Sequence, residues 1–532
     1  MTVTAPPAGP SGQVEPETAP APRGRSLLRF LPAVVAVLSG ALLYVSFPPR
    51  PLWFLALPAF AGFGWVLRER AWKPAFGLGY LFGLGFFVPL LKWTGVEVGP
   101  LPWLALAAIE AVFAGMVGMG VAAVSRLPGW PLWAAALWTA GEAARARAPF
   151  SGFPWGKIAF GQADGIFLPL AAVGGTPVLG FAVVLCGFGL YDAVRLVRER
   201  RLARAVTRPA AAVALLSVAV PVAGALAARS LVSDKAEDGT ATVAAIQGNV
   251  PRLGLEFNAQ RRAVLEYHAR ETQRLAAEVK AGKAAKPDFV LWPENSSDVN
   301  PFTDAAAYSV ITQAVQAIGA PVSVGSVVDR DGKWFNEQIL WDPAKGPTQT
   351  YDKRQIQPFG EYMPLQGLVS AINPKWTAMA SSFTRGTKPG VFTIGGTKVG
   401  IATCYEAAFD WDVRDTVTHG AQLISVPSNN ATFDRSEMTY QQLAMSRVRA
   451  VEHSRTVVVP VTSGVSAIIM PDGRISQKTG MFVADSLVQK VPLRSSETPA
   501  TKMGILPEML LVLVAAGGLG WAIGSGLRAR RA

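Results

Sequence analysis

The chain has 532 residues, of which half are hydrophobic and only 16% are charged. Its mean hydropathy of +0.28 is too high for an ordinary soluble protein, so membrane-spanning segments are expected. The net charge of +13 would suit a nucleic-acid partner, but the conspicuous basic clusters stand beside apolar segments. That placement is typical of a membrane orientation signal, so no nucleic-acid partner is expected.

Apolar segments of membrane-spanning length divide the chain into parts. Residues 1–25 are rich in Pro and Ala and are expected to form a disordered tail, without a convincing cleavable signal peptide. Residues 26–230 are expected to form a membrane domain of about seven transmembrane helices, and 504–527 an eighth. The apolar segments are 27–46, 52–67, 74–91, 102–124, 130–144, 167–191, 209–228 and 505–526. The predicted architecture is therefore a membrane α-helical bundle with a further domain between its last two helices.

Basic residues flank these segments unevenly. With eight spans, most of the flanking clusters fall on one side: Arg23, Arg25, Arg29, Arg68, Arg70, Lys73, Arg126, Arg195, Arg198, Arg200, Arg201, Arg204, Arg528, Arg530 and Arg531. The positive-inside rule makes that side cytoplasmic, together with both termini. Arg145, Arg147 and Lys157 fall on the other side and depart from the pattern. The segment 230–503 is then extracytoplasmic.

Residues 235–495 have a different character, because short apolar strands alternate with helical segments. Such alternation predicts a layered α/β domain. The expected strands are 242–247, 289–292, 321–327, 398–403, 423–426, 456–461 and 466–470, and the expected helices lie near 258–281, 304–318 and 436–453. Cys404 is the one cysteine of this domain, so no internal disulfide is expected there.

Cys404 follows the apolar run Val399–Thr403, which predicts a buried strand, and a helix is expected from about Ala408. A cysteine at such a turn lies near a helix N-terminus, whose dipole favours a thiolate. The alternative is a small buried residue that fills a gap in the core, as free cysteines often do. An extracytoplasmic thiol is a liability unless it is buried or used, which favours a functional role.

Two further motifs place an ionisable side chain after an extended run. Glu294 ends Val290-Leu291-Trp292-Pro293-Glu294, and Lys353 stands in Tyr351-Asp352-Lys353-Arg354. Taken singly, Glu294 could be a helix N-terminal carboxylate and Lys353 a solvated surface charge. With a thiol they make a complete set for acyl transfer, in which cysteine attacks a carbonyl, glutamate moves protons and lysine stabilises the oxyanion.

In this order the three motifs resemble those of the nitrilase (carbon–nitrogen hydrolase) superfamily, and the resemblance implies an αββα sandwich over about 240–490. The match becomes more specific with four further stretches, which look like the apolipoprotein N-acyltransferase family. These stretches are Gln247-Gly248-Asn249-Val250-Pro251, Pro358-Phe359-Gly360-Glu361-Tyr362, Cys404-Tyr405-Glu406 and, in the membrane part, Gly152-Phe153-Pro154-Trp155.

The resemblance implies that Cys404 is the nucleophile, Glu294 the general base and Lys353 the oxyanion-stabilising residue. It makes Glu361, Tyr405 and Glu406 supporting residues of the active site. Substrate-binding positions are expected at Phe257, Phe359, Met363, Trp376 and Phe433. Two stretches depart from the family pattern: Phe257 is offset by one residue from the usual aromatic position, and Asn429-Asn430-Ala431-Thr432-Phe433-Asp434 replaces a related motif.

The implied reaction has two steps and no cofactor. A phospholipid ester acylates Cys404, and the α-amine of a diacylglyceryl-cysteine at the N-terminus of an apolipoprotein then takes the acyl chain. A monomer is expected, and the family implies a place in the bacterial inner membrane. No metal site is expected, because His268, His419 and His453 form no cluster with ligand spacing.

Two other functions compete with this interpretation. A membrane-tethered amidase would share the same three residues but deliver water to the acyl-enzyme, although a soluble hydrolase has no need of eight spans. A receptor or scaffold with an inactive nitrilase fold would have no need of Glu294, Lys353 and Cys404 together.

The stretch 362–380 is crowded with large apolar residues and carries Lys375 as its one charge. It is either a buried core helix or a mobile arm that rests on the membrane's outer face and guides acyl chains to Cys404. Gly360 and Gly367 would act as hinges of such an arm, and Met363 and Met379 would adapt to different chains.

Overall fold

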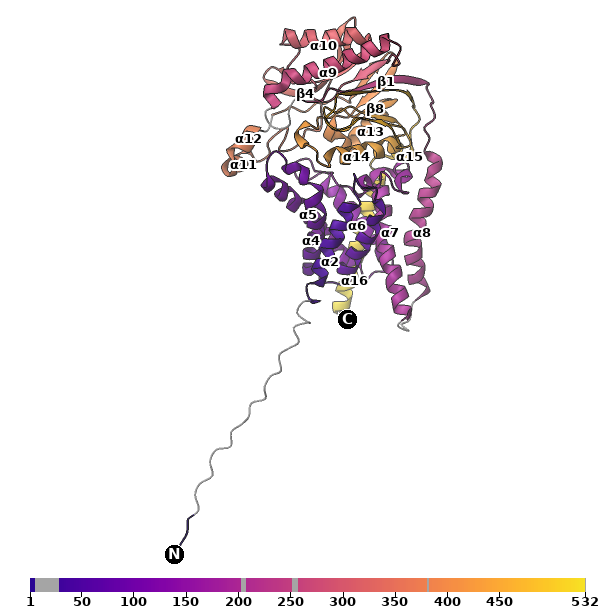
Figure 1. Ribbon diagram of the computed structural model, residues 1–532. Coiled ribbons are helices and arrows are strands. Elements are labelled where there is room, and N and C mark those ends of the chain that lie inside the picture. The colour runs from indigo at the N-terminus through magenta and orange to yellow at the C-terminus, as the bar shows by residue number, and fades with distance from the viewer. Residues whose placement is uncertain (5–27, 202–206, 251–256, 380–381, 532) are drawn as a thin grey trace.

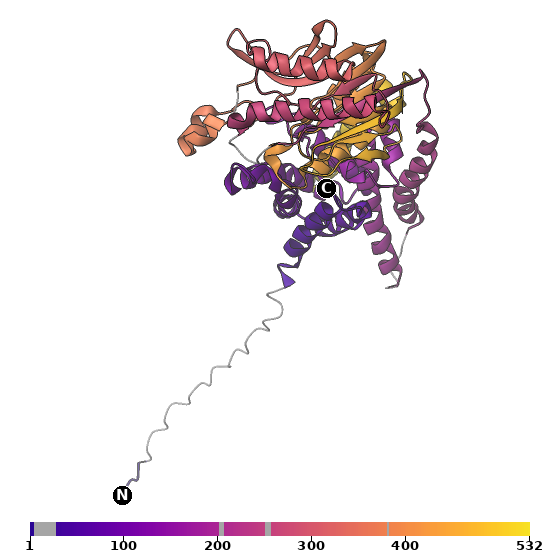
Figure 2. The ribbon, with the colours of Figure 1, turned by 45° about the horizontal axis from the view of Figure 1, so that its top comes forward.

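The computed structural model describes residues 1–4, 28–201, 207–250, 257–379 and 382–531, without the side chains of 257–260, 378–379 and 527–531. A bundle of helices carries a layered α/β domain on one end (Figures 1 and 2). The helices of the bundle are α2 (Leu31–Val45), α3 (Ala56–Leu67), α4 (Trp72–Leu90), α5 (Pro100–Val124), α6 (Trp130–Arg145), α7 (Ala171–Arg201), α8 (Arg208–Ala228) and α16 (Leu506–Arg531).

Each apolar segment of the sequence overlaps one of these helices. Five stretches are long and apolar enough to cross a membrane, namely Trp72–Leu90, Pro100–Val124, Leu168–Arg201, Arg208–Leu231 and Leu506–Gly526. The other helices, α2, α3 and α6, have 15, 12 and 16 residues. A membrane-helix bundle is confirmed, and the number of eight spans stays a prediction.

Small residues let the bundle helices approach closely. A Cβ on Gly79 of α4 would lie 2.5 Å from the Ala114 carbonyl oxygen of α5, and one on Gly83 would lie 2.8 Å from the Ala111 Cα. Helices in lipid gain little from hydrophobic burial against each other, so close van der Waals packing of this kind holds them together.

The α/β domain consists of two six-stranded sheets between two layers of helices. The first sheet has the order β12-β1-β2-β3-β4-β5 and the second the order β11-β10-β9-β8-β7-β6. Its strands are β1 (Thr240–Gln247), β2 (Phe289–Leu291), β3 (Val322–Arg330), β4 (Lys333–Asp342), β5 (Gly346–Asp352), β6 (Val391–Ile394), β7 (Thr397–Ile401), β8 (Leu423–Ser425), β9 (Thr456–Val459), β10 (Ala467–Ile469), β11 (Ile475–Lys478) and β12 (Asp485–Pro492).

The helices of this domain are α9 (Phe257–Lys280), α10 (Ala305–Ile318), α11 (Gln366–Ile372), α12 (Pro374–Met379), α13 (Asp410–Thr418), α14 (Met438–His453) and α15 (Pro499–Met503). The layering follows from the strand alternation. Val243 and Ala245 of β1 face the core between the two sheets, whereas Ala244 and Ile246 face the core under α9 and α10. Both faces of the strand are therefore buried. The predicted αββα sandwich is confirmed.

The second helical layer, α13 and α14, lies against the membrane bundle (Figure 1). One hydrophobic core runs across this junction, since it includes Phe60 and Phe160 of the membrane part together with Tyr405, Met445 and Val451 of the α/β domain. The two parts are therefore packed as one body.

The three cations that depart from the positive-inside pattern each have an acidic partner. Arg145 contacts Glu110 at 3.0 Å, Arg147 pairs with Glu508, and Lys157 contacts Asp410 at 2.6 Å. Arg145 and Glu110 are both buried, with side chains 4% and 2% exposed. Each of these cations therefore has a counter-charge within the protein, which accounts for its position outside the basic clusters.

We expect Glu110→Leu to lower the free energy of unfolding by about 3 to 5 kcal/mol, because it leaves the buried Arg145 guanidinium without its counter-charge. Thermal unfolding in detergent measures the effect. Glu110→Gln keeps a hydrogen-bond acceptor and is expected to cost less. The control is Glu199→Leu, whose partner Arg195 is 21% exposed, so the loss should stay within about 1 kcal/mol. Equal losses for the two Leu variants would contradict this account.

Candidate active site

The residues singled out in the sequence follow the carboxyl ends of strands from both sheets. Glu294 follows β2, Lys353 follows β5 and Cys404 follows β7. The Lys353 ammonium lies 2.8 Å from Glu294 Oε1 and 2.9 Å from Glu361 Oε1. Lys353, Glu294 and Cys404 are only 2%, 4% and 8% exposed. The three candidates thus come from distant parts of the chain into one buried site, with Glu361 as a fourth member.

Both carboxylates are held by further donors. Asn336 Nδ2 lies 2.7 Å from Glu294 Oε1 and 2.8 Å from Glu361 Oε1. The backbone N–H of Asn429 donates to Glu294 Oε2 at 3.0 Å, and the backbone N–H of Gln357 donates to Glu361 Oε2 at 2.6 Å. Asn336 therefore bridges the two acids beside Lys353. Sequence reasoning missed it, because it lies in β4, a strand that had not been predicted.

The charge state of Lys353 follows from these neighbours. Burial alone would lower the pKa of the ammonium, but the carboxylates of Glu294 and Glu361 outweigh burial and raise that pKa well above its usual value. Lys353 therefore remains a cation at neutral pH. A buried cation at this place can stabilise negative charge that develops on a bound carbonyl oxygen.

Cys404 occupies a strained turn. Its φ is +53°, a left-handed conformation that costs a non-glycine residue about 1–3 kcal/mol. The turn is held by neighbours: the Cys404 amide donates to the Pro427 carbonyl at 2.9 Å, and the Thr403 amide donates to Glu406 Oε2 at 2.6 Å. Gln442 Nε2 lies 3.5 Å from the Cys404 sulfur. Such strain at a buried thiol is characteristic of functional turns.

The helix expected from about Ala408 begins later. Cys404–Ala408 form a 3-10 turn, and α13 starts at Asp410. Burial raises the pKa of the Cys404 thiol, Glu294 raises it further, and Lys353 offsets part of the shift. Burial therefore favours the neutral thiol, and a base must remove the thiol proton before the sulfur can attack.

Glu406 supports the cysteine turn through hydrogen bonds to its carboxylate. Its carboxylate accepts hydrogen bonds from the Tyr351 hydroxyl at 2.9 Å and from the Thr403 backbone N–H. It also accepts hydrogen bonds from the backbone N–H groups of Arg354 and Gln355, at 2.6 and 3.0 Å. Because Arg354 and Gln355 directly follow Lys353, Glu406 ties the lysine segment to the cysteine turn.

The membrane part contributes one wall of the site. The Tyr405 hydroxyl donates to the Gly152 carbonyl at 3.0 Å, and the Tyr405 ring stacks on Phe153 with centroids 6.0 Å apart. Gly152 has φ +83°, and a Cβ there would lie 2.1 Å from the Ala146 carbonyl carbon, so only glycine fits. Trp155 Nε1 donates to Gln441 Oε1 at 2.7 Å. The Gly152–Trp155 motif thus packs directly beside the cysteine turn.

Two family models match this chain, the apolipoprotein N-acyltransferase N-terminal domain over residues 39–189 and the carbon–nitrogen hydrolase domain over 242–498. The chain is 47% identical to the apolipoprotein N-acyltransferase of Mycolicibacterium smegmatis over 92% of its own length and 85% of that protein. It belongs to the apolipoprotein N-acyltransferase family.

The enzyme of that name from Geobacter metallireducens is 30% identical, over 88% of this chain and 91% of that protein. Among solved structures, an amidase of the nitrilase superfamily from Nesterenkonia AN1 is 19% identical, with a TM-score of 0.38, and the match covers 50% of this chain and 95% of the amidase.

The expected substrate-binding residues lie around the site in different environments. Phe433 packs edge-on against Trp93 at 5.0 Å, and Phe359 packs edge-on against Phe150 at 5.7 Å while remaining 47% exposed. Met363 and Trp376 are partly buried. Phe257 begins α9, and its side chain lies outside the described residues.

A cavity of about 450 Å³ lies where the α4–α5 connection meets the catalytic domain. Its lining includes Trp93, Trp103, Arg435 and Glu437. Sequence reasoning missed this cavity, since its walls come from the ends of spans and from the loop before α14. The composition of these short connections carried no signal of their joint position.

The histidines have ordinary structural environments. His268 Nδ1 lies 2.8 Å from the Val264 carbonyl, His453 Nδ1 lies 2.9 Å from Thr501 Oγ1, and His419 is exposed. Within the described part of the chain, no three His, Cys, Asp or Glu side chains are placed to hold a metal ion.

Proposed function

We propose that this protein transfers an acyl chain from a membrane phospholipid to the α-amino group of the N-terminal diacylglyceryl-cysteine of apolipoproteins, through a thioester on Cys404. The observation that carries the proposal is the buried ammonium of Lys353 beside Glu294, next to the strained Cys404 turn. Membership of a family whose curated members are named apolipoprotein N-acyltransferases supports the acceptor.

In the first step, Glu294 accepts the proton of the Cys404 thiol, and the sulfur attacks the ester carbonyl of the phospholipid. Lys353 stabilises the oxyanion of the tetrahedral intermediate. The carbon–oxygen ester bond then breaks, and Glu294 returns the proton to the departing lysophospholipid. The products are a thioester on Cys404 and a lysophospholipid.

In the second step, the free amine of the lipoprotein attacks the thioester carbonyl, and Glu294 accepts a proton from that amine. The carbon–sulfur bond breaks, and the proton passes to the Cys404 sulfur. The enzyme returns to its starting state by a ping-pong route. The raised pKa of Cys404 supports this cycle, because the resting thiol needs a base before it attacks.

The site's place against the membrane bundle distinguishes this function from its rivals. An amidase acting on small soluble amides needs no wall from membrane helices, and a scaffold needs no buried ammonium between two carboxylates. We further propose that the catalytic domain is extracytoplasmic in the bacterial inner membrane, that both termini are cytoplasmic, and that the enzyme is a monomer.

Cys404→Ser should abolish both the acyl adduct and transfer, because a serine hydroxyl has a far higher pKa than a thiol and Glu294 cannot readily ionise it. Intact-mass analysis of protein purified with phospholipid measures the adduct, and lipoprotein N-acylation measures transfer. Full N-acylation by the Ser variant would remove Cys404 from the mechanism.

Glu294→Gln should accumulate no thioester, since the amide keeps the side-chain volume but cannot accept the thiol proton. Lys353→Met should lower the rate of thioester formation by about 100- to 1000-fold, the usual cost of one oxyanion donor. Both rates are measured by adduct formation in a single turnover. A normal rate in either variant would make that residue structural.

The segment after the lysine motif supports contact with lipid. Helices α11 and α12 project sideways from the α/β domain (Figures 1 and 2), near the end of the bundle that carries this domain (Figure 1). Leu365, Leu368 and Ile372 are 58%, 60% and 59% exposed. The alternative of a buried core helix is therefore wrong. We propose that this arm rests on the outer face of the membrane that the bundle spans and guides acyl chains to Cys404.

Leu368→Asp or Trp376→Asp should impair acylation from phospholipid vesicles more than reaction with a small soluble ester, because only the first reaction needs the membrane-facing arm. The two rates of adduct formation provide the measurement. The control is Phe302→Asp, an exposed aromatic residue just before α10, for which neither rate should change. Equal losses with both donors, together with a lower melting temperature, would contradict the arm.

A further inference from the structure

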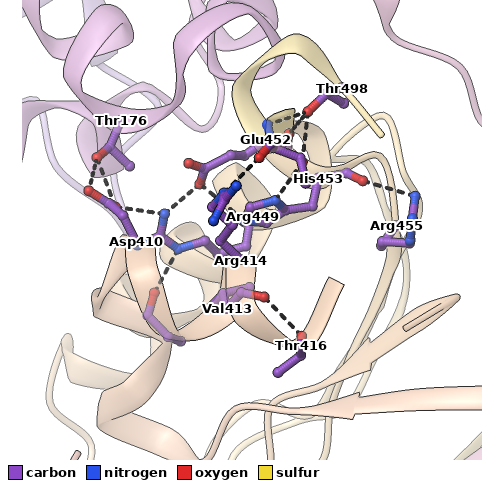
Figure 3. Close-up of polar contacts among 12 residues, drawn as sticks. Thr176, Asp410, Val413, Arg414, Thr416, Arg449, Glu452, His453, Arg455 and Thr498 are labelled. Atoms are coloured by element: carbon purple, nitrogen blue, oxygen red, sulfur yellow. Dashed lines mark hydrogen bonds and ion pairs between the residues drawn. The ribbon is translucent and has the colours of Figure 1, made fainter. Parts of the chain in front are cut away.

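A cluster of charged side chains lies between the cysteine turn and the membrane helices, outside the proposed catalytic groups, and all of them are buried except Asp410, which is 28% exposed. It consists of Arg449 and Glu452 on α14, Asp410 at the start of α13, and Lys157 in the connection after α6. Figure 3 shows Asp410 between Thr176 of α7 and Arg449. The proposed reaction assigns no role to these residues.

Arg449 holds the end of the turn that begins with Cys404. Its Nε donates to the Ala407 carbonyl at 2.8 Å, and its Nη2 donates to the Ala408 carbonyl at 3.1 Å. These carbonyls belong to the last two residues of Cys404–Ala408. The Arg449 side chain is completely buried, so the guanidinium is bound on all sides by protein.

The remaining nitrogen of Arg449 reaches two carboxylates. Nη1 lies 2.8 Å from Asp410 Oδ1 and also pairs with Glu452. A planar guanidinium can direct its donors at carbonyls and carboxylates together, whereas a lysine ammonium cannot reproduce that fork. Arg449 therefore joins the turn to Asp410 in a fixed geometry.

Asp410 in turn is bound by the membrane part. Lys157 Nζ lies 2.6 Å from Asp410 Oδ2, and the Thr176 hydroxyl lies 2.9 Å from Oδ1 and 3.2 Å from Lys157 Nζ. Thr176 follows a break in α7 at Gly174 and Gly175, where the backbone is non-helical. A Cβ on Gly175 would lie 2.6 Å from Glu452 Oε1, so the glycine at this break lets Glu452 of the catalytic domain approach the α7 backbone closely.

We propose that Lys157, Thr176, Asp410 and Arg449 form a clamp through which the membrane domain positions the cysteine turn for thioester formation. Arg449 is a positioning residue, since it contacts the carbonyls of the turn and not the reacting atoms. The proposal rests on the proposed function, because its readout is the thioester on Cys404. It predicts that the catalytic domain reaches its full acylation rate only when docked on Lys157 and Thr176.

The test measures single-turnover acylation of Cys404 by a soluble ester, as rate constant and as half-saturating ester concentration, together with the melting temperature. Arg449→Lys keeps the charge but loses the fork, and it should lower the rate constant by about 10- to 100-fold, because small misplacements of a reacting group cost up to about 100-fold. The half-saturating concentration should not change.

Lys157→Met should lower the same rate constant, whereas Lys157→Arg, which keeps the positive charge, should retain most of the wild-type value. The combination of Lys157→Met with Asp410→Asn should cost less than the product of the two single losses, because the residues act through one contact. Thr176→Val is the mildest variant and should lower the rate by about two- to fivefold. If Arg449→Lys does not fold, the Lys157 and Thr176 variants decide the test.

The matched control is Arg447→Lys, on the same helix. Arg447 also joins the two parts, through Asp164 at 2.7 Å and the Gly473 carbonyl at 2.8 Å, but neither of those partners belongs to the cysteine turn. Its acylation rate should equal that of the wild type. An equal rate loss for Arg447→Lys would mean that general domain docking, and not this clamp, controls acylation.

Unchanged rate constants in the folded Arg449, Lys157 and Thr176 variants, with only lower melting temperatures, would overturn the clamp and leave the proposed function intact. Absence of any acyl adduct on wild-type Cys404 would instead overturn the proposed function and the clamp with it. The two failures are therefore distinguishable in one set of measurements.

Discussion

The site depends on the compensation of one buried cation. An ammonium that is 2% exposed is tolerated only beside opposite charge, and Lys353 has the carboxylates of Glu294 and Glu361 at 2.8 and 2.9 Å. Two like charges on one ammonium must themselves be held apart and in place. Asn336 inside β4 and two backbone amides do so, which requires β4 to bring Asn336 to the ends of β2 and β5. The sheet topology is thus the precondition of the charge arrangement.

The cysteine side of the site is built on the opposite sheet and needs the membrane domain. Cys404 lies in a left-handed turn that Glu406 supports through Thr403, while Tyr405 is bonded to Gly152. Arg449 holds the same turn from the other end. Because a single hydrophobic core continues from the membrane helices to Tyr405 and Val451, the turn and its supports are packed together. The conformation of the turn therefore depends on both parts of the chain.

Several residues illustrate why sequence reasoning stopped where it did. Glu294, Lys353 and Cys404 could be predicted because each stands after an extended run, and a family resemblance connected them. Asn336 and Gln442 carry no comparable local signal: the first lies inside a strand and the second on a helix, and only their contacts with Glu294 and Cys404 give them meaning. Arg145, Arg147 and Lys157 depart from the orientation pattern of the sequence, and their ion pairs with Glu110, Glu508 and Asp410 exist only in the folded protein.

The sequence by itself determined the membrane bundle, the α/β alternation and the main candidate residues, because hydropathy, period and short motifs are properties of neighbouring residues. The tertiary structure alone decided the bridging by Asn336, the wall formed by Gly152–Trp155, the exposure of α11 and the contacts of Arg449 with the cysteine turn. Contacts such as Lys157 with Asp410 join residues 253 positions apart. No local pattern encodes such a pairing, since it exists only once the two domains are packed and the buried charges must find their partners.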